Sequence, residues 1–147
     1  MKTGIVATEA QLLPYLVHRT AGVLARSWLD VLRGHGMTVA RWQVLSILQE
    51  YDGSRVGELA RMAAVEQPVM SRVVDQMERD GLVQRRPSPA DARVTEVWLS
   101  RSGRRVFTTL LPEAERWVDG ALAGIDAATV RAVSAALLTV MANVEGS

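Results

Sequence analysis

Arginines are the residues of this 147-residue chain with the clearest potential for chemistry, because the usual catalytic and metal-binding types are scarce. Cysteine is absent, which excludes disulfides, thiolate nucleophiles, cysteine-ligated zinc and thiol-based redox sensing. The two histidines, His18 and His35, are too few for a histidine-rich metal site, and neither adjoins a serine elbow or a glycine-rich phosphate loop. We therefore expect no enzyme activity, no metal and no cofactor.

The charged residues are unevenly distributed, although the net charge is only +1. Residues 53–105 carry 10 basic and 7 acidic side chains, whereas residues 106–147 carry 2 basic and 5 acidic ones. The basic excess is greatest between Gln84 and Arg105, where six arginines accompany two acidic residues. Such a patch is compatible with a polyanionic partner. Charge alone equally permits a solvated, arginine-rich loop.

Hydrophobic periodicity and turn residues predict the elements that must position these arginines. Apolar residues at three- and four-residue steps predict a helix over Pro14–Arg33, with Pro14 at its first position. Thr38 is expected to cap a second helix that ends near Tyr51. Two short helices follow, at about 56–64 and 68–80, and the tight turn between them indicates a helix-turn-helix.

A short hairpin and two further helices complete the predicted order. Residues 82–86 and 94–99 are predicted strands, because side chains alternate along the second and prolines mark the turn between them. Ser100 should cap a helix that reaches about Ala123 and bends at Pro112, and Asp126 should cap a last helix to about Asn143. The fold class is therefore mainly α with a small β-hairpin, a helix-turn-helix followed by a basic wing.

The second short helix has one apolar and one polar face. With Val73 at the centre and about 100° per residue, Val69, Met70 and Met77 share the apolar face. An α-helix fits the DNA major groove, where Arg reads guanine and Gln reads adenine. Any surface helix also has a polar outer face, so this pattern gains weight only from the basic hairpin that follows. The polar face holds Pro68, Ser71 and Asp75, flanked by Gln67, Arg72 and Arg79.

Together these stretches resemble the multiple antibiotic resistance regulator (MarR) family of bacterial transcription factors. The resemblance covers about 38–105, and its motifs are Gly57–Ala60, Gln67–Glu78, Gly81–Arg85, Asp91–Arg93 and Leu99–Gly103. The chain departs from the family pattern at Arg55, where a threonine cap is frequent, and at Ser100, which replaces a threonine. The absence of cysteine also excludes the peroxide-sensing branch of the family.

The resemblance implies a homodimer whose recognition helices enter successive major grooves and whose wing arginines enter minor grooves. Arg93 matches the wing-tip arginine, and Asp91 matches the carboxylate that orients it. A narrow A·T-rich minor groove independently attracts arginine through its enhanced negative potential. The pair also fits an ordinary turn salt bridge, and both interpretations can hold. The expected DNA-contacting residues are Gln67, Pro68, Ser71, Arg72, Arg79, Arg86, Asp91 and Arg93.

The terminal segments are too apolar for a winged helix of this size to cover. From Val106 onward 24 of 42 residues are apolar, so we expect these helices to dimerise, although they could instead fold back on their own chain. The family also binds small aromatic acids or phenols between its dimerisation helices and winged helix. The candidate ligand residues are Tyr15, His18, Arg19 and Trp42, which could equally be core and surface residues.

We therefore expect one continuous domain, with a DNA-binding region over 38–105 and a helical dimerisation region over 9–34 and 106–144. The expected function is sequence-specific binding of double-stranded DNA at a palindromic operator as a repressor, with release by a small aromatic ligand. The alternative is a winged-helix module for protein contacts, which would not need arginines at both DNA-facing points. The start Met1–Gly4 lacks the features of a signal peptide, and the longest uncharged run, 132–144, is too short to span a membrane. Both observations favour a cytoplasmic location.

Overall fold

The computed structural model describes residues 8–146, which form six helices and one two-stranded hairpin. The expectation for Met1–Gly4 lies outside these residues. The chain divides into two compact units, one ending at Ala114 and the other beginning at Glu115. The first contains the helix-turn-helix and the hairpin. The predicted fold class, mainly α with a winged helix-turn-helix, is confirmed.

Helix α1 spans Glu9–Arg33 and begins before the predicted first residue, Pro14. Its start is set by a capping box, in which the hydroxyl of Thr8 accepts the Gln11 amide at 3.3 Å. The side-chain oxygen of Gln11 accepts the Thr8 amide in return at 2.8 Å. The prediction of Pro14 at the first position is therefore wrong, because the reciprocal cap starts the helix five residues earlier, at Glu9, and leaves Pro14 inside it.

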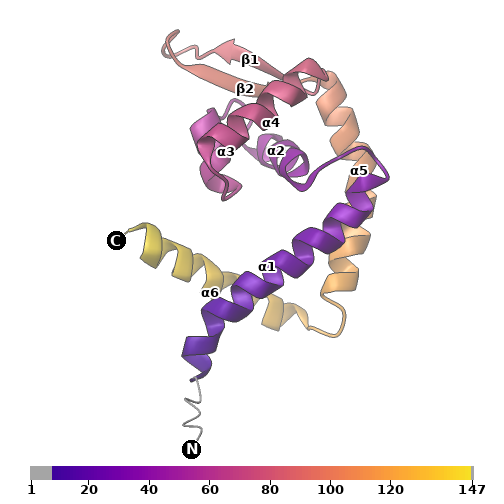
Figure 1. Ribbon diagram of the computed structural model, residues 1–147, viewed down its shortest axis with the longest axis vertical. Helices are drawn as coiled ribbons and strands as arrows, with labels where there is room; N and C mark the ends of the chain where they lie inside the picture. Colours follow the sequence, from indigo (N-terminus) through magenta and orange to yellow (C-terminus); the bar gives the residue numbers. More distant parts are fainter. Residues whose placement is uncertain (1–7, 147) are drawn as a thin grey trace, which may run out of the picture. The chain divides into compact units, whose positions relative to one another are not determined.

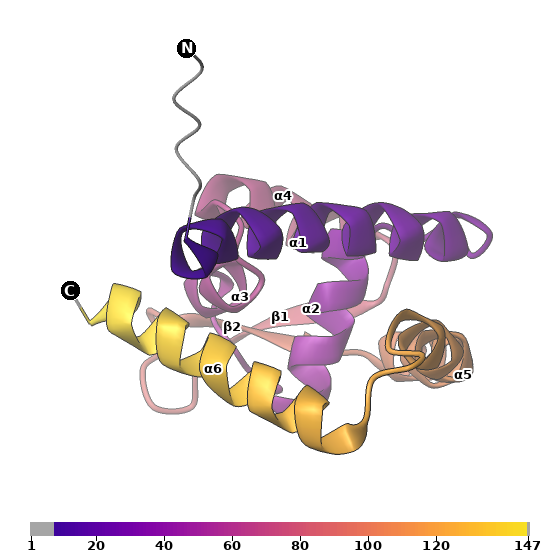
Figure 2. The ribbon, with the colours of Figure 1, turned by 90° about the horizontal axis from the view of Figure 1, so that it is seen from below.

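Three helices form the core of the first unit: α2 (Val39–Glu50), α3 (Val56–Met62) and α4 (Gln67–Arg79). The predicted cap of α2 is confirmed, since the Thr38 hydroxyl accepts the Arg41 amide at 3.2 Å. Helix α2 runs crosswise to α1 (Figure 2). The fully buried side chains of these three helices are Val44, Leu45, Leu48, Leu59, Met70, Val74 and Met77.

The wing is an antiparallel hairpin of β1 (Val83–Pro87) and β2 (Thr95–Leu99), in which Val83 pairs with Leu99. It lies beside α4, and its tip projects beyond the helices of this unit (Figure 1). Buried Val83, Val97 and Leu99 attach one face of the hairpin to the core. The predicted cap that follows is confirmed, because the Ser100 hydroxyl accepts the Gly103 amide at 3.0 Å.

Helix α5 (Arg101–Ala121) begins in the first unit and ends in the second, where α6 (Ala127–Glu145) follows. Asp126 caps α6 as predicted, with its carboxylate accepting the Thr129 amide at 2.7 Å. Helix α6 contains the apolar run at 132–144 and has no buried residue. Among the described residues, α6 is also the helix whose length and apolar composition would suffice to cross a membrane.

Candidate nucleic-acid interface

The buried stripe of α4 runs through Met70, Val74 and Met77. Val73 is only half-buried, and Val69 is 40% exposed. The prediction that centred the apolar face on Val73 is therefore wrong by one residue. The orientation of α4 is set by the elements that it contacts, α2, α3 and β1. The side of α4 that carries Met70 and Met77 is buried.

The rotation of α4 changes which side chains point outward. Arg72 and Gln76 lie about 160° around the helix from Val74, so they occupy the middle of the exposed face rather than its flank. Arg79 is exposed beside them, whereas Ser71 is half-buried. Sequence reasoning did not select Gln76, although its place one turn after Arg72 was a usable signal. Arg72 and Gln76 are the types that read guanine and adenine edges.

Gln67 and Pro68 lie in the first turn of α4, and both are exposed. The amide group of Gln67 points back over α3, since its Oε1 lies 3.4 Å from the position a Cβ on Gly57 would take. Gln67 is thus close to the protein backbone, and a glycine at 57 allows this approach. Pro68 has no backbone N–H, which suits the first turn of a helix.

Helix α4 and the wing are joined by ion pairs of Arg85. Its guanidinium lies 2.7 Å from the Asp75 carboxylate and 3.2 Å from that of Glu78, and its backbone N–H donates to Glu78 at 2.9 Å. The Arg85 side chain is only 24% exposed, so these charges are partly shielded from water. Asp75 therefore belongs to a structural contact between α4 and β1 rather than to a free polar face.

The wing tip carries Arg93 in a bidentate pair with Asp91. Nε and Nη2 of Arg93 donate to the two carboxylate oxygens at 3.1 and 3.0 Å, and the Arg93 backbone N–H donates to Asp91 at 3.0 Å. These bonds lower the pKa of Asp91 below its ordinary value and raise that of Arg93. The Arg93 side chain is nevertheless 91% exposed, so it is held in place while most of its surface faces solvent.

Arg86 lies on the opposite face of the hairpin from Arg85, because neighbouring residues of a strand alternate. Its guanidinium donates to Gln84 Oε1 at 2.7 Å and lies 5.7 Å from the centre of the Trp98 ring, a cation–π contact. Trp98 in turn covers Gly53, where a Cβ would lie 2.6 Å from the indole. Arg86 is exposed but engaged, so its side chain contributes to the wing surface as part of this stack.

Comparison with known proteins identifies the family to which this fold belongs. The MarR family model matches residues 35–94. The crystal structure of a MarR-family transcriptional regulator from Silicibacter pomeroyi is 30% identical and superposes with a TM-score of 0.80, covering 93% of this chain and 96% of that one. The chain belongs to the MarR family.

Two curated relatives support the same assignment. The HTH-type transcriptional repressor IacR of Pseudomonas putida is 28% identical over 131 residues, covering 89% of this chain and 78% of that protein. The transcriptional activatory protein BadR of Rhodopseudomonas palustris is 31% identical over 104 residues, covering 69% of this chain and 59% of its own length. This MarR-family chain is therefore a DNA-binding transcriptional regulator and not an enzyme.

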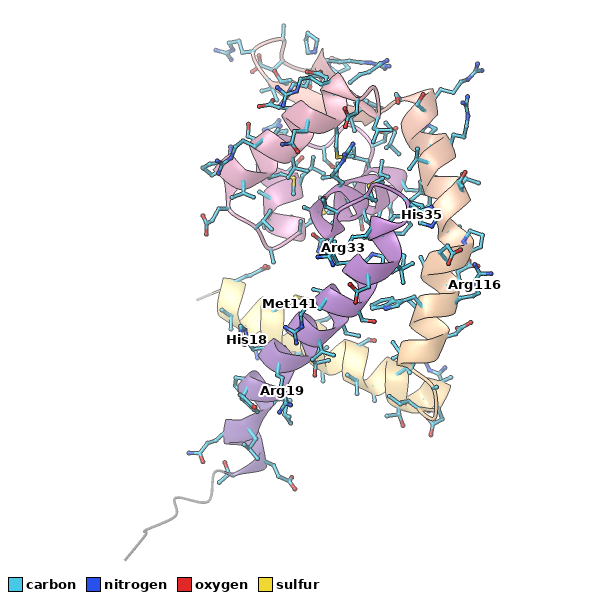
Figure 3. The ribbon with its side chains drawn as sticks, turned by 45° about the vertical axis from the view of Figure 1, so that its right-hand side comes forward. His18, Arg19, Arg33, His35, Arg116 and Met141 are labelled. Atoms are coloured by element: carbon cyan, nitrogen blue, oxygen red, sulfur yellow. The ribbon has the colours of Figure 1, made fainter. Side chains whose placement is uncertain are left out.

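The candidate ligand residues of this regulator fall into two separate places. His18 and Arg19 are exposed on the N-terminal half of α1 (Figure 3). Tyr15 is exposed on the same half of the helix, and its hydroxyl accepts from Arg19 at 3.2 Å. Trp42 lies between other aromatic rings, stacked on Phe107 at 5.2 Å and edge-on to Trp28 at 5.4 Å. Because His18 precedes Trp28 by ten residues, it lies about 15 Å from it along the helix. Trp42 therefore does not form one site with Tyr15, His18 and Arg19 within the chain.

Proposed function

We propose that this regulator binds a palindromic operator as a homodimer and represses transcription from it. The observation that carries the proposal is the wing tip, where Asp91 holds a 91% exposed Arg93 on the hairpin whose first strand contacts α4. A fixed arginine loses little conformational freedom on entering a minor groove. In this proposal Gln67, Pro68, Ser71, Arg72, Arg79, Arg86, Asp91 and Arg93 form the contact surface.

Binding-site selection on random duplex DNA tests this proposal. A two-fold dimer should select an inverted repeat whose half-sites lie about one helical turn apart. Affinity should fall steeply with salt, because each neutralised phosphate contributes about 0.9 to the slope of log affinity against log salt. Selection of single, non-palindromic sites would contradict the dimeric operator, and weak binding without sequence preference would favour a module for protein contacts.

The dimer is supported by apolar surface on helices outside the helix-turn-helix. Helix α1 exposes Leu13, Leu16 and Val17, and α6 exposes Leu138 and Val144 at 62% and 72%. Apolar surface of this kind marks an interface or a membrane contact. A second copy of the chain provides equivalent apolar helices, and a dimeric reader of an inverted repeat needs that copy. The helical dimerisation region accordingly comprises 9–34 and 106–144, and the DNA-binding region 38–105.

The same proposal includes a small aromatic acid that releases the operator. Arg19 borders a shallow hollow of about 290 Å³ on α1, and with His18 it offers cationic and hydrogen-bonding groups for a carboxylate. Because Trp42 lies apart from these residues in one subunit, a shared site requires α1 of the second subunit. Titration with benzoate and hydroxybenzoates should show Arg19→Ala binding more weakly than the wild-type protein, and equal affinities would exclude Arg19. A DNA-binding regulator of this kind acts in the cytoplasm.

A further inference from the structure

A hollow lies between α4 and the wing, the two elements that we propose to contact DNA. It measures about 530 Å³ and is lined by Arg55 and Gly57 at the start of α3, by Gln67 in the first turn of α4, and by Val94 and Thr95 where β2 begins. Sequence reasoning did not place Arg55 in the interface, because 12 residues separate it from Gln67 and about 40 from the wing tip.

The charge in this hollow is available to a ligand. Glu58 also lines it, but its carboxylate accepts the backbone N–H of Arg55 at 2.7 Å and is occupied in capping α3. The Arg55 side chain is exposed and has no ion pair within the described residues. Its charge acts at longer range on Asp91, whose two carboxylate oxygens already bind Arg93. The guanidinium of Arg55 is thus a free cation beside the wing.

The geometry of duplex DNA indicates that a sugar–phosphate backbone is the part that would lie in this hollow. Major and minor grooves alternate along the duplex, and one sugar–phosphate backbone separates each groove from the next. A protein that inserts α4 into a major groove and Arg93 into the neighbouring minor groove must straddle that backbone. On such a duplex the backbone would pass between α4 and the wing, along the hollow that Arg55 lines. Phosphates are well matched to the fork of donors on a guanidinium.

We propose that Arg55 binds a phosphate of the backbone that passes between α4 and the wing. The proposal rests on the proposed operator binding by α4 and Arg93. The Arg55 contact would not depend on the DNA sequence. It would fix the positions of α4 and Arg93 relative to one another on the duplex. Position 55 precedes α3 but gives it no side-chain cap, so an arginine here is not explained by helix capping.

The variant Arg55→Thr tests this contact without weakening the fold. Threonine removes the charge and supplies a hydroxyl that can cap α3, so thermal stability should be retained. At 0.1 M salt the operator affinity should fall by about eightfold per subunit relative to the wild-type protein, with the difference vanishing toward 1 M. The slope of log affinity against log salt should decrease by about 0.9 per subunit. The selected operator sequence should not change, and Arg55→Lys should retain most of the affinity.

Two controls separate this contact from other causes. Arg33→Ala removes an arginine that pairs with Asp30 at the end of α1, and it should leave the salt slope unchanged. In an Arg93→Ala background, Arg55→Thr should still cause its full loss, because a phosphate contact does not act through Asp91. Loss of the effect in that background would overturn the proposal and make Arg55 a positioning residue of the wing.

Two further outcomes distinguish a failure of the Arg55 contact from a failure of operator binding. Wild-type binding to the operator with an unchanged affinity and salt slope for Arg55→Thr would refute the Arg55 contact and leave operator binding intact. A wild-type protein that selects no DNA sequence would instead refute the proposed function, and the Arg55 contact with it.

Discussion

At the residue scale, Arg93 is the sharpest test of the interface. Because its side chain is 91% exposed, Arg93→Ala should leave the melting temperature almost unchanged. Operator affinity should fall, most strongly for sites with A·T-rich flanks, since the contact reads groove width and charge. Binding isotherms at two salt concentrations should show the salt slope reduced by about 0.9 per wing.

Asp91→Ala is the matched control for Arg93→Ala, because it removes the orienting carboxylate and leaves the cation. It should weaken operator binding less than Arg93→Ala does. If both variants instead lower the melting temperature together while the folded protein binds normally, the pair only closes the turn and the wing contact is wrong.

The lowered pKa of Asp91 gives a second prediction at this scale. The hydrogen bonds from Arg93 hold the pKa of Asp91 below 3.8, its ordinary value. A carboxyl group with a depressed folded-state pKa stabilises the fold above its unfolded pKa, and that contribution is lost as the pH falls through the folded value. The wing-tip pair should therefore persist from neutral pH down to below pH 3.8.

Carbon-13 NMR of the Asp91 carboxyl group measures this pKa directly. In the Arg93→Ala variant the pKa should rise toward 3.8, because the principal hydrogen bonds are gone. An Asp91 pKa that is the same in both proteins would show that the bidentate pair does not form in solution.

At the scale of elements, the wing is positioned by the start of α5. A Cβ at Gly103 would collide with the backbone carbonyl of Leu82, the residue that precedes β1. Gly103→Ala must therefore displace α5 from the wing, and we expect a loss of about 1–3 kcal/mol in the free energy of unfolding. Chemical denaturation measures this loss.

Gly120→Ala, in the same helix, is the control for Gly103→Ala. A Cβ at Gly120 would meet no atom within 4 Å, so this substitution should stabilise the helix by about 0.5–1 kcal/mol. Equal effects of the two substitutions would show that α5 does not press against the wing in solution.

At the scale of the whole molecule, the exposed helices predict a homodimer. Sedimentation without detergent should give a particle of twice the 16.1 kDa chain mass at micromolar concentration. Leu138→Glu in α6 should shift the equilibrium toward monomers, because it places a charge in an apolar interface. Tyr51→Glu, at an exposed residue after α2, should not. A monomeric wild-type particle, or one soluble only with detergent, would contradict the dimer.

Features that depend on neighbours along the chain are predictable from the amino-acid sequence. The caps at Thr38, Ser100 and Asp126 were predicted correctly, because a capping side chain bonds to an amide only two or three residues away. The hairpin and its basic tip were predictable for the same reason, since Asp91 and Arg93 are two residues apart. The set of motifs spaced over 38–105 was sufficient to indicate the family.

The way in which the elements face one another is set by tertiary packing. The rotation of α4 that buries Val74 rather than Val73 is imposed by α2, α3 and β1, and periodicity leaves it uncertain by one residue. The pairing of Arg85 with Asp75 joins two different elements, and the place of Arg55 beside Val94 and Thr95 of the wing joins residues that are about 40 positions apart. Such contacts depend on the packing of whole elements against one another. Because the free energy of that packing is spread over many side chains, no local sequence pattern predicts these contacts.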